Sequence, residues 1–176
     1  MSADHGLSPA QAGAFAHAGV DATTAAGTAG GSRWAIVVAR FNGGITDALF
    51  QGAVDTLVAA GARAEHIRAV TVPGAVEIPL ATRELAETSH FAGIIALGCV
   101  IRGDTAHFDY VCSATTDGVL RVQLDHGIPV GFGLITCDTI EQAQARAQLG
   151  GGHNVGADAA AAALELAALV RDIRSS

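Results

Sequence analysis

The chain has 176 residues, of which half are hydrophobic and 15% are charged, enough for one domain with a full core. Its formal net charge is −7 with only ten Lys plus Arg, and no basic run is present, so nucleic acid is not an expected partner. No apolar run reaches the ~18 residues that a membrane span needs, and the first thirty residues do not resemble a secretory signal. We therefore expect a cytoplasmic protein that does not enter membranes.

Three cysteines without Cys-x-x-Cys spacing argue against a disulfide framework and against a zinc site. Two of them, Cys112 and Cys137, have the apolar surroundings of buried free thiols. Cys99 follows a strand and could be a nucleophile, but no histidine stands near it in the sequence to activate it. No metal site is predicted.

Residues 1–31 have the composition of a flexible N-terminal tail, and residues 32–176 are expected to form a single domain. Within that domain, apolar runs predict strands at 34–39, 66–72, 92–97 and 129–136. Helical patterns are expected at about 46–60, 78–87, 105–125, 139–149 and 156–173. This alternation predicts an α/β fold, a parallel four-stranded sheet with helices on both faces.

Ligands of such sheets bind beyond the carboxyl ends of the strands, so we expect the functional side chains in the loops that follow the strands. Phe41 follows the first strand and could offer its ring to a planar heterocycle, or only plug the sheet edge. After the second strand, Glu77 falls in the first turn of a helix. Its carboxylate could accept hydrogen bonds from ligand hydroxyls, or only complement the helix dipole.

The third strand is followed by the most informative segment, 98–111, in which glycines and polar residues precede a helix. Asp104 or Thr105 could cap that helix, and the free N–H groups of its first turn could bind phosphate. His107 is the best candidate for proton transfer, although a lone helical histidine is often structural. After the fourth strand, Arg146 could bind a phosphate or be an ordinary surface residue.

Taken together, five segments resemble the lumazine synthases, in which they occur in the same order and spacing. The likeness covers about residues 34–169. The segments are Arg40-Phe41-Asn42, 72–79 (Val-Pro-Gly-Ala-Val-Glu-Ile-Pro), 98–111 (Gly-Cys-Val-Ile-Arg-Gly-Asp-Thr-Ala-His-Phe-Asp-Tyr-Val), 129–133 (Pro-Val-Gly-Phe-Gly) and 141–146 (Glu-Gln-Ala-Gln-Ala-Arg).

This resemblance implies a flavodoxin-like three-layer α/β/α sandwich and a place in riboflavin biosynthesis. Members condense 5-amino-6-(D-ribitylamino)uracil with 3,4-dihydroxy-2-butanone 4-phosphate, releasing phosphate and water, without a metal or organic cofactor. They form homopentamers or multiples of pentamers. Riboflavin synthase is a further candidate partner.

The resemblance also implies a role for each matching residue. His107 would move protons and Phe41 would stack on the pyrimidine. Asp104 and Thr105 would contact the phosphate, together with Arg146 of a neighbouring subunit. The remaining substrate contacts would come from Ala75, Val76, Glu77, Cys99, Val100, Ile101 and, from the neighbour, Phe132.

One departure stands before the last helix, where many members carry Asn-Lys-Gly near the substrates. Here the stretch ends in His153-Asn154-Val155-Gly156, so Val155 replaces a lysine or histidine. His153 or Asn154 could compensate for that loss. The departure keeps open the alternative of a non-catalytic paralogue that binds flavins or lumazines or forms a shell.

Overall fold

The computed structural model describes residues 29–176, so most of the tail expected at 1–31 lies outside the described part. Ala29 is buried in the core, and its N–H donates to the carbonyl of Ala60 at 2.9 Å. The chain therefore joins the core a few residues before the first strand. No helix of residues 29–176 is both long and apolar enough to cross a membrane.

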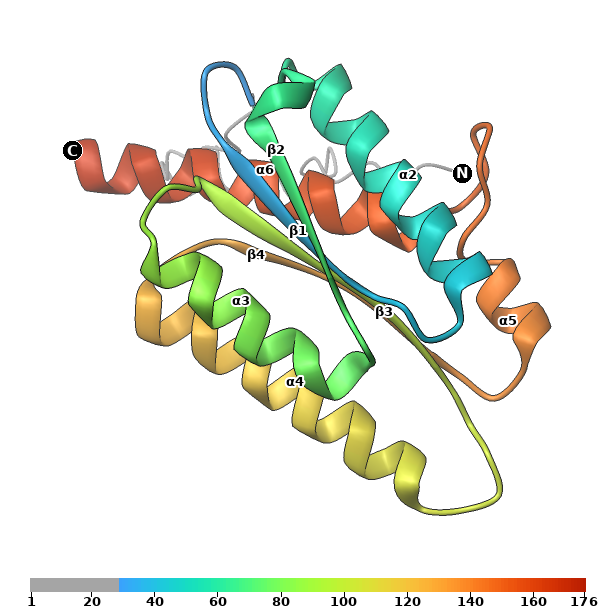
Figure 1. Ribbon diagram of the computed structural model, residues 1–176. Helices are drawn as coiled ribbons and strands as arrows, with labels where there is room; N and C mark the ends of the chain where they lie inside the picture. The colour runs from blue at the N-terminus through green and yellow to red at the C-terminus, as the bar shows by residue number, and fades with distance from the viewer. Residues whose placement is uncertain (1–28) are drawn as a thin grey trace, which may run out of the picture.

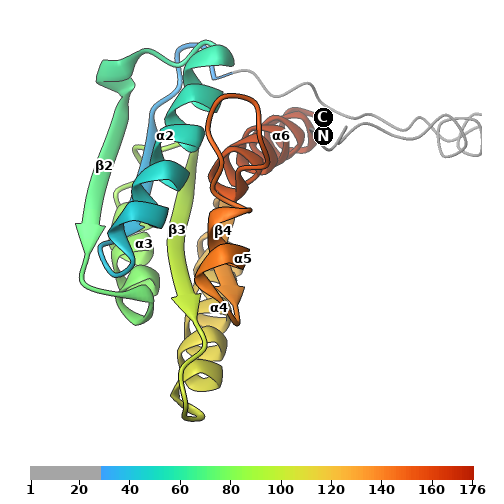
Figure 2. The ribbon, with the colours of Figure 1, turned by 90° about the vertical axis from the view of Figure 1, so that its right-hand side faces the viewer.

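The four strands form one parallel sheet in the order β2-β1-β3-β4 (Figure 1). Their bounds are β1 Trp34–Ala39, β2 Ile67–Val72, β3 Gly93–Ile101 and β4 Val130–Cys137. β2 and β4 are the edge strands, as the view along the sheet shows (Figure 2). This parallel α/β arrangement is the flavodoxin-like fold that the sequence predicts.

Helices cover both faces of the sheet, which completes three layers (Figure 1). α2 and α6 pack on one face, and α3 and α4 pack on the other. The helices are α2 Gly43–Ala59, α3 Ile78–Glu87, α4 His107–His126, α5 Ile140–Gln144 and α6 Val155–Ser175, with short 3₁₀ turns at Ala64–His66 and Ala75–Glu77.

Side chains of the central strands alternate between two apolar cores because successive residues of a strand point to opposite faces. In β3, Ile95, Leu97 and Cys99 pack toward α2 and α6. Ile94 and Ala96 pack toward α3 and α4. Every residue of β1 is buried, as expected for a strand covered on both faces.

Two glycines allow helix α6 to approach its neighbours closely. A Cβ on Gly156 would lie within 2.0 Å of the Leu49 carbonyl oxygen of α2, and one on Gly131 within 2.1 Å of the Ala159 carbonyl oxygen. Because backbone atoms cannot move aside like a side-chain tip, only glycine fits at these contacts. They hold α6 against both α2 and the edge strand β4.

The bounds of α2 and α5 differ from those expected. α2 begins at Gly43, because the Asn42 carbonyl already accepts hydrogen bonds from the N–H groups of Ile45 and Thr46. The helix expected at 139–149 ends at Gln144 as α5. Beyond it, Ala147 pairs with Asn154 in an antiparallel bridge, and Gly150 and Gly151 adopt positive φ in the turn between them.

Candidate active site

A cavity of about 530 Å³ lies at the carboxyl ends of β1, β2 and β3, beside the start of α4. Its walls come from the loops after these strands, where a parallel sheet places its ligands. Nine of the twelve residues predicted for the site line it. They are Phe41, Ala75, Val76, Glu77, Cys99, Val100, Ile101, Thr105 and His107.

Phe41 stands at the end of β1, and its side chain is 71% exposed. Its N–H donates to the Pro73 carbonyl at 3.2 Å, which ties this loop to the loop after β2. The next residue, Asn42, adopts a left-handed conformation (φ 60°) and donates from Nδ2 to the Cys99 carbonyl at 3.0 Å. A ring this exposed does not plug the sheet edge, so it is free to stack on a ligand.

Glu77 is positioned by the tight turn after β2. Its Oε2 accepts a hydrogen bond from the Gly74 N–H at 2.9 Å, which ties the residue before the turn Ala75–Glu77 to the end of that turn. The carboxylate is exposed to the cavity and retains further acceptor capacity. Its structural bond to the Gly74 N–H therefore leaves the carboxylate able to accept hydrogen bonds from the cavity.

β3 continues four residues beyond its expected end, so Cys99, Val100 and Ile101 belong to the sheet. The Cys99 side chain packs toward α2 and α6, on the face opposite to the Val100 side chain. Cys99 therefore presents its backbone to the cavity rather than its thiol.

Burial, together with the smaller effect of the neighbouring Cys137 thiol, raises the pKa of the Cys99 thiol to about 12. A thiol with this pKa is protonated at neutral pH, and the thiolate is the nucleophilic form. The nucleophile considered for Cys99 from the sequence is therefore not supported, and Cys99 is a buried core thiol.

α4 begins at His107, later than expected, with Ala106 as its N-cap and no side-chain cap. The expectation that the side chain of Asp104 or Thr105 caps this helix is wrong. The Asp109 N–H, which such a cap would bind, donates to the Ala106 carbonyl at 3.0 Å. Thr105 Oγ1 accepts only a long bond (3.4 Å) from the His107 N–H. Among the described residues the Phe108 N–H has no hydrogen bond and the His107 N–H makes only this long one, so these two groups remain available to an anion.

Asp104 is exposed on the loop before α4 and does not line the cavity. Four residues that we did not single out do line it. Phe108 and Val111 lie on α4 within one turn of His107, and a spacing of three or four residues along a helix is the signal that could have found them. The other two are Gly74 and Gly103.

Arg102 holds the loop between β3 and α4. Its Nε donates to Asp138 Oδ1 at 2.9 Å, and its Nη2 donates to Asp109 Oδ1 at 3.2 Å. Its guanidinium also lies 4.0 Å from the centre of the Phe108 ring. Hydrogen bonds to Asp109 and Asp138 raise the pKa of Arg102 above its usual value. Two carboxylates thus neutralise the guanidinium beside the cavity.

Two predicted residues lie away from this cavity in the single chain. Phe132 is 40% exposed on the edge strand β4, and Arg146 is exposed beyond α5. Arg146 donates from Nη1 to the Gln142 carbonyl at 2.9 Å within its own turn. Neither lines the cavity of its own chain, so any contribution from them would have to reach the site of another copy.

The stretch before α6 makes structural contacts. Asn154 is 5% exposed and accepts from the Ala157 N–H at 3.0 Å, while its Nδ2 donates to the Ala48 carbonyl at 2.9 Å. His153 Nε2 lies 3.1 Å from Asp158 Oδ2. Val155 packs against the core formed with α2 and α6. None of the three lines the cavity, and within residues 29–176 no cluster of His, Cys, Asp or Glu could hold a metal.

A match to a protein family identifies the domain that contains this cavity. The family model described as 6,7-dimethyl-8-ribityllumazine synthase matches residues 31–171. The chain belongs to the lumazine synthase family. The match runs from just before β1 into the last turns of α6, so every residue predicted for the site falls within the lumazine synthase domain. Membership supports a role in riboflavin biosynthesis in general.

Proposed function

We propose that the chain is a 6,7-dimethyl-8-ribityllumazine synthase, a cofactor-independent transferase. It would condense 5-amino-6-(D-ribitylamino)uracil with 3,4-dihydroxy-2-butanone 4-phosphate and release phosphate and water. The observation that carries this proposal is the gathering of nine predicted residues from three separate segments around one cavity. A cavity of about 530 Å³ is also within the size range of small-molecule sites.

We assign the two substrates to different lining residues of the cavity. The Phe41 ring would stack on the pyrimidine, and the backbone of Cys99, Val100 and Ile101 would contact its edge. The ribityl hydroxyls would donate to the Glu77 carboxylate, which has acceptor capacity left beyond its bond to the Gly74 N–H.

The phosphate would bind where Thr105 presents its hydroxyl and the first turn of α4 presents the N–H groups of His107 and Phe108. Arg102 is the cation nearest in sequence, but its two carboxylate partners compensate its charge. We therefore assign the positive charge for the phosphate to Arg146 of a neighbouring subunit.

The chemistry needs proton transfers rather than a strong nucleophile. The chain contains no lysine, so no ε-amine can form a Schiff base with the ketone, and the substrate's own amine must do so. Imine formation, phosphate elimination, ring closure and dehydration follow, with His107 as the proton carrier. Holding two reactants together supplies much of the rate, and one histidine adds roughly 10²–10⁴-fold.

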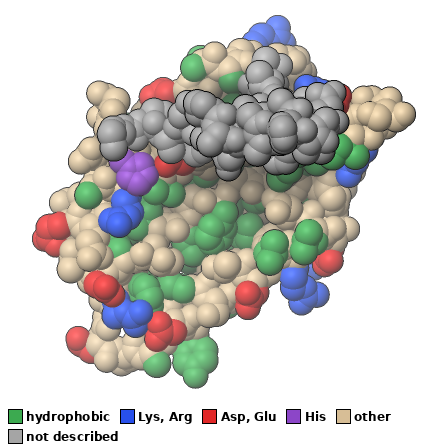
Figure 3. Space-filling view, turned by 180° about the vertical axis from the view of Figure 1, so that it is seen from behind, with side chains coloured by type: hydrophobic (Ala, Val, Ile, Leu, Met, Phe, Trp, Pro, Cys, Tyr) green, Lys and Arg blue, Asp and Glu red, His purple; other side chains and the backbone are tan. Residues whose placement is uncertain are grey.

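Exposed apolar side chains support assembly into a homo-oligomer. Apolar groups gather over the middle of the face seen in Figure 3, and large exposed apolar patches commonly mark protein interfaces. On β4 and α4 the large exposed apolar side chains are Phe132, Tyr110, Leu120 and Leu124. We propose a pentamer or a multiple of pentamers in the cytoplasm. Contact with riboflavin synthase stays a prediction.

The test is absorbance-monitored turnover of the purified protein with both substrates. We expect lumazine to form well above the spontaneous rate, and to form far more slowly in His107→Ala and Arg146→Ala variants. Arg121→Ala is the matched control, because Arg121 is an exposed arginine of α4 that does not line the cavity. Equal rates in the Arg146 and Arg121 variants would contradict the assigned phosphate contact.

The second candidate function is a non-catalytic protein that binds flavins or lumazines. It is favoured by Val155, a partly buried apolar residue where many family members carry lysine. Under this alternative, turnover would equal the uncatalysed background while riboflavin or lumazine still binds. A Val155→Lys variant that gained turnover would then identify the missing group.

A further inference from the structure

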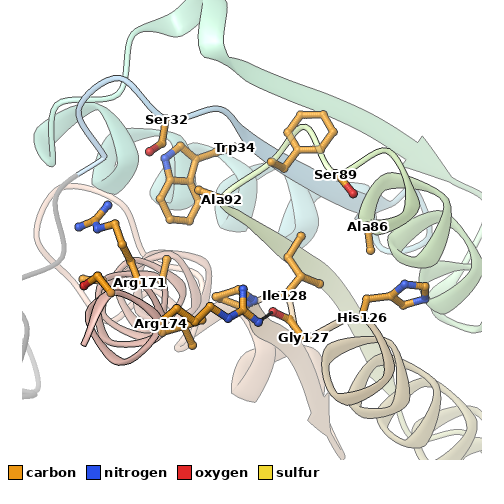
Figure 4. Close-up of a pocket in the computed structure, with 16 residues that line it drawn as sticks. Ser32, Trp34, Ala86, Ser89, Ala92, His126, Gly127, Ile128, Arg171 and Arg174 are labelled. Carbon is orange, nitrogen blue, oxygen red and sulfur yellow. Dashed lines mark hydrogen bonds between the residues drawn. The ribbon is translucent and has the colours of Figure 1, made fainter.

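A second cavity, of about 520 Å³, lies at the end of the sheet opposite to the candidate active site. It is lined by Trp34 at the start of β1, and by Ala92 and Pro129 just before β3 and β4. Figure 4 shows Trp34 and Ala92 on one side of this hollow and Arg171 and Arg174 of α6 on the other. Nothing in the proposed reaction uses this cavity.

The charge around this hollow is opposite in sign to that of the chain. Two of the ten cationic residues line it, Arg171 and Arg174, together with His126, whereas no Asp or Glu is among its described lining residues. Within the part of the chain that the structure describes, neither arginine forms an ion pair. Arg174 donates to the Gly127 carbonyl at 3.0 Å, which leaves Arg171 as the freer cation.

Trp34, one of the lining residues, carries a hydrogen-bond donor without a partner. It is only 1% exposed, and its Nε1 has no hydrogen-bond partner among residues 29–176. A buried N–H without an acceptor costs free energy. The hydroxyls of Ser32 and Ser89 supply further donors at the rim.

The number of anionic charges that the site can accept is limited by the neighbouring helices. α3, α4 and α6 all end beside the hollow, and helix carboxyl ends carry partial negative charge. Arg174 offsets the end of α4 through its bond to Gly127. The remaining excess of positive charge is small, which favours one anionic group over a polyanion. Much of the remaining lining is apolar, including Phe91, Ile128 and Val170.

We propose that this hollow is a second binding site, distinct from the candidate active site, for a small organic monoanion with an apolar body. The anionic group is held by Arg171, and the apolar body lies on the wall formed by Phe91, Ile128 and Val170. This assignment does not depend on the proposed reaction, because the two cavities lie at opposite ends of the strands and share no lining residue.

The chain provides its own reporter, because Trp34 is its single tryptophan. The probe is 8-anilinonaphthalene-1-sulfonate, an aromatic monosulfonate that accepts energy from tryptophan emission. We expect saturable binding to the full-length protein, with loss of Trp34 emission. Octanoate should displace the dye, whereas acetate and pyrophosphate at the same concentration should not.

The dye affinities of single variants show which of the two cavities binds the dye. Arg171→Gln should weaken binding about tenfold, the effect of removing one charge-assisted hydrogen bond, and Arg171→Lys should restore most of it. Arg121→Gln, the matched arginine of α4, and Phe41→Ala, in the other cavity, should bind like the wild type. Thermal unfolding verifies that each variant is folded. Because Arg171 is exposed, its substitution should leave the melting temperature nearly unchanged.

Three outcomes would overturn the proposal. They are an absence of energy transfer from Trp34, unchanged affinity in Arg171→Gln, and loss of binding in Phe41→Ala, which would put the dye in the candidate active site. Displacement by pyrophosphate as effectively as by octanoate would contradict the preference for a monoanion.

Discussion

The guanidinium of Arg102 donates from Nε to Asp138 Oδ1 across 2.9 Å and thereby joins the loop after β3 to the end of β4. The same guanidinium reaches Asp109 in the first turn of α4 and covers the Phe108 ring. Thr105 and His107, which line the cavity, lie on the segment enclosed by these contacts. The position of the candidate catalytic residues thus depends on a residue that does not line the cavity.

Removal of Arg102 is expected to lower activity more than stability. In Arg102→Ala the loop that carries Thr105 and His107 loses its anchor, and we expect kcat/KM to fall about ten- to hundredfold, as small misplacements of catalytic groups do. Because all three charged partners are exposed, the melting temperature should change little. Steady-state kinetics and calorimetry test this prediction.

The conservative variant separates positioning from bulk charge. Arg102→Lys keeps the charge but cannot reach both carboxylates with a planar fork, so it should recover only part of the activity. Full recovery in Arg102→Lys, or an equal loss in Arg121→Ala, would argue against a positioning role.

Asn154 is expected to be essential for stability rather than for catalysis. Its side chain makes three hydrogen bonds, to the Ala48 and Gln148 carbonyls and from the Ala157 N–H. Asn154→Ala should reduce the free energy of unfolding by about 2–3 kcal/mol, because it leaves buried partners unsatisfied and removes the cap of α6. Denaturant unfolding measures the change.

A graded control exists at the same position. Asn154→Ser retains an oxygen that can cap α6 but loses the two amide donors, so its stability should be intermediate. If Asn154→Ala were as stable as the wild type but inactive, Asn154 would be a catalytic residue that compensates for Val155.

The buried Cys99 thiol makes stability depend on pH in the alkaline range. Its folded-state pKa is raised to about 12 from the ordinary 9.0, so between these values the native state retains a proton that the unfolded chain loses. Its contribution to stability is complete below pH 9 and is lost as the pH rises toward 12. Unfolding by denaturant between pH 8 and 11 should therefore show a steeper decline for the wild type than for Cys99→Ala.

The same thiol should resist alkylation. At neutral pH iodoacetamide should leave Cys99 unmodified in the native protein and modify it after unfolding. Rapid native-state labelling of Cys99, located by peptide mass spectrometry, would contradict both its burial and its raised pKa.

A site shared between subunits predicts complementation. His107→Ala and Arg146→Ala variants should each be nearly inactive as pure oligomers. When they are unfolded together and reassembled, some sites combine an intact His107 with an intact neighbouring Arg146 and should recover part of the activity. Verified mixed oligomers without recovery would indicate that both residues act within one chain.

The helix boundaries show how far local sequence can be read. All four strands and the main helices lie where the apolar periodicity predicts them, because burial on both faces leaves a strong pattern. The predicted ends of the helices are less accurate than their positions. α4 begins at His107 without the predicted side-chain cap, because the Ala106 carbonyl is the acceptor of the first hydrogen bonds of the helix. The helix after β4 stops at Gln144, since the glycine turn beyond it allows Ala147 to pair with Asn154.

The sequence by itself determined the fold class and, through five segments in a fixed order, the lumazine synthase family. The strand ends by themselves indicated Phe41, Glu77, Thr105 and His107, because the carboxyl ends of parallel strands meet at one edge, and the family resemblance implied the other five predicted residues that line the cavity. These are properties of periodicity and spacing, which a single chain carries in its order of residues.

Only the tertiary structure decided which partner each polar group meets. It directs Asn154 to the cap of α6 rather than to the cavity, neutralises Arg102 with Asp109 and Asp138, and buries the Cys99 thiol on the far face of β3. It also assembles the second cavity from Trp34 and α6, which lie more than a hundred residues apart in the chain. Such pairings depend on contacts between distant segments, so no local pattern of residues specifies them.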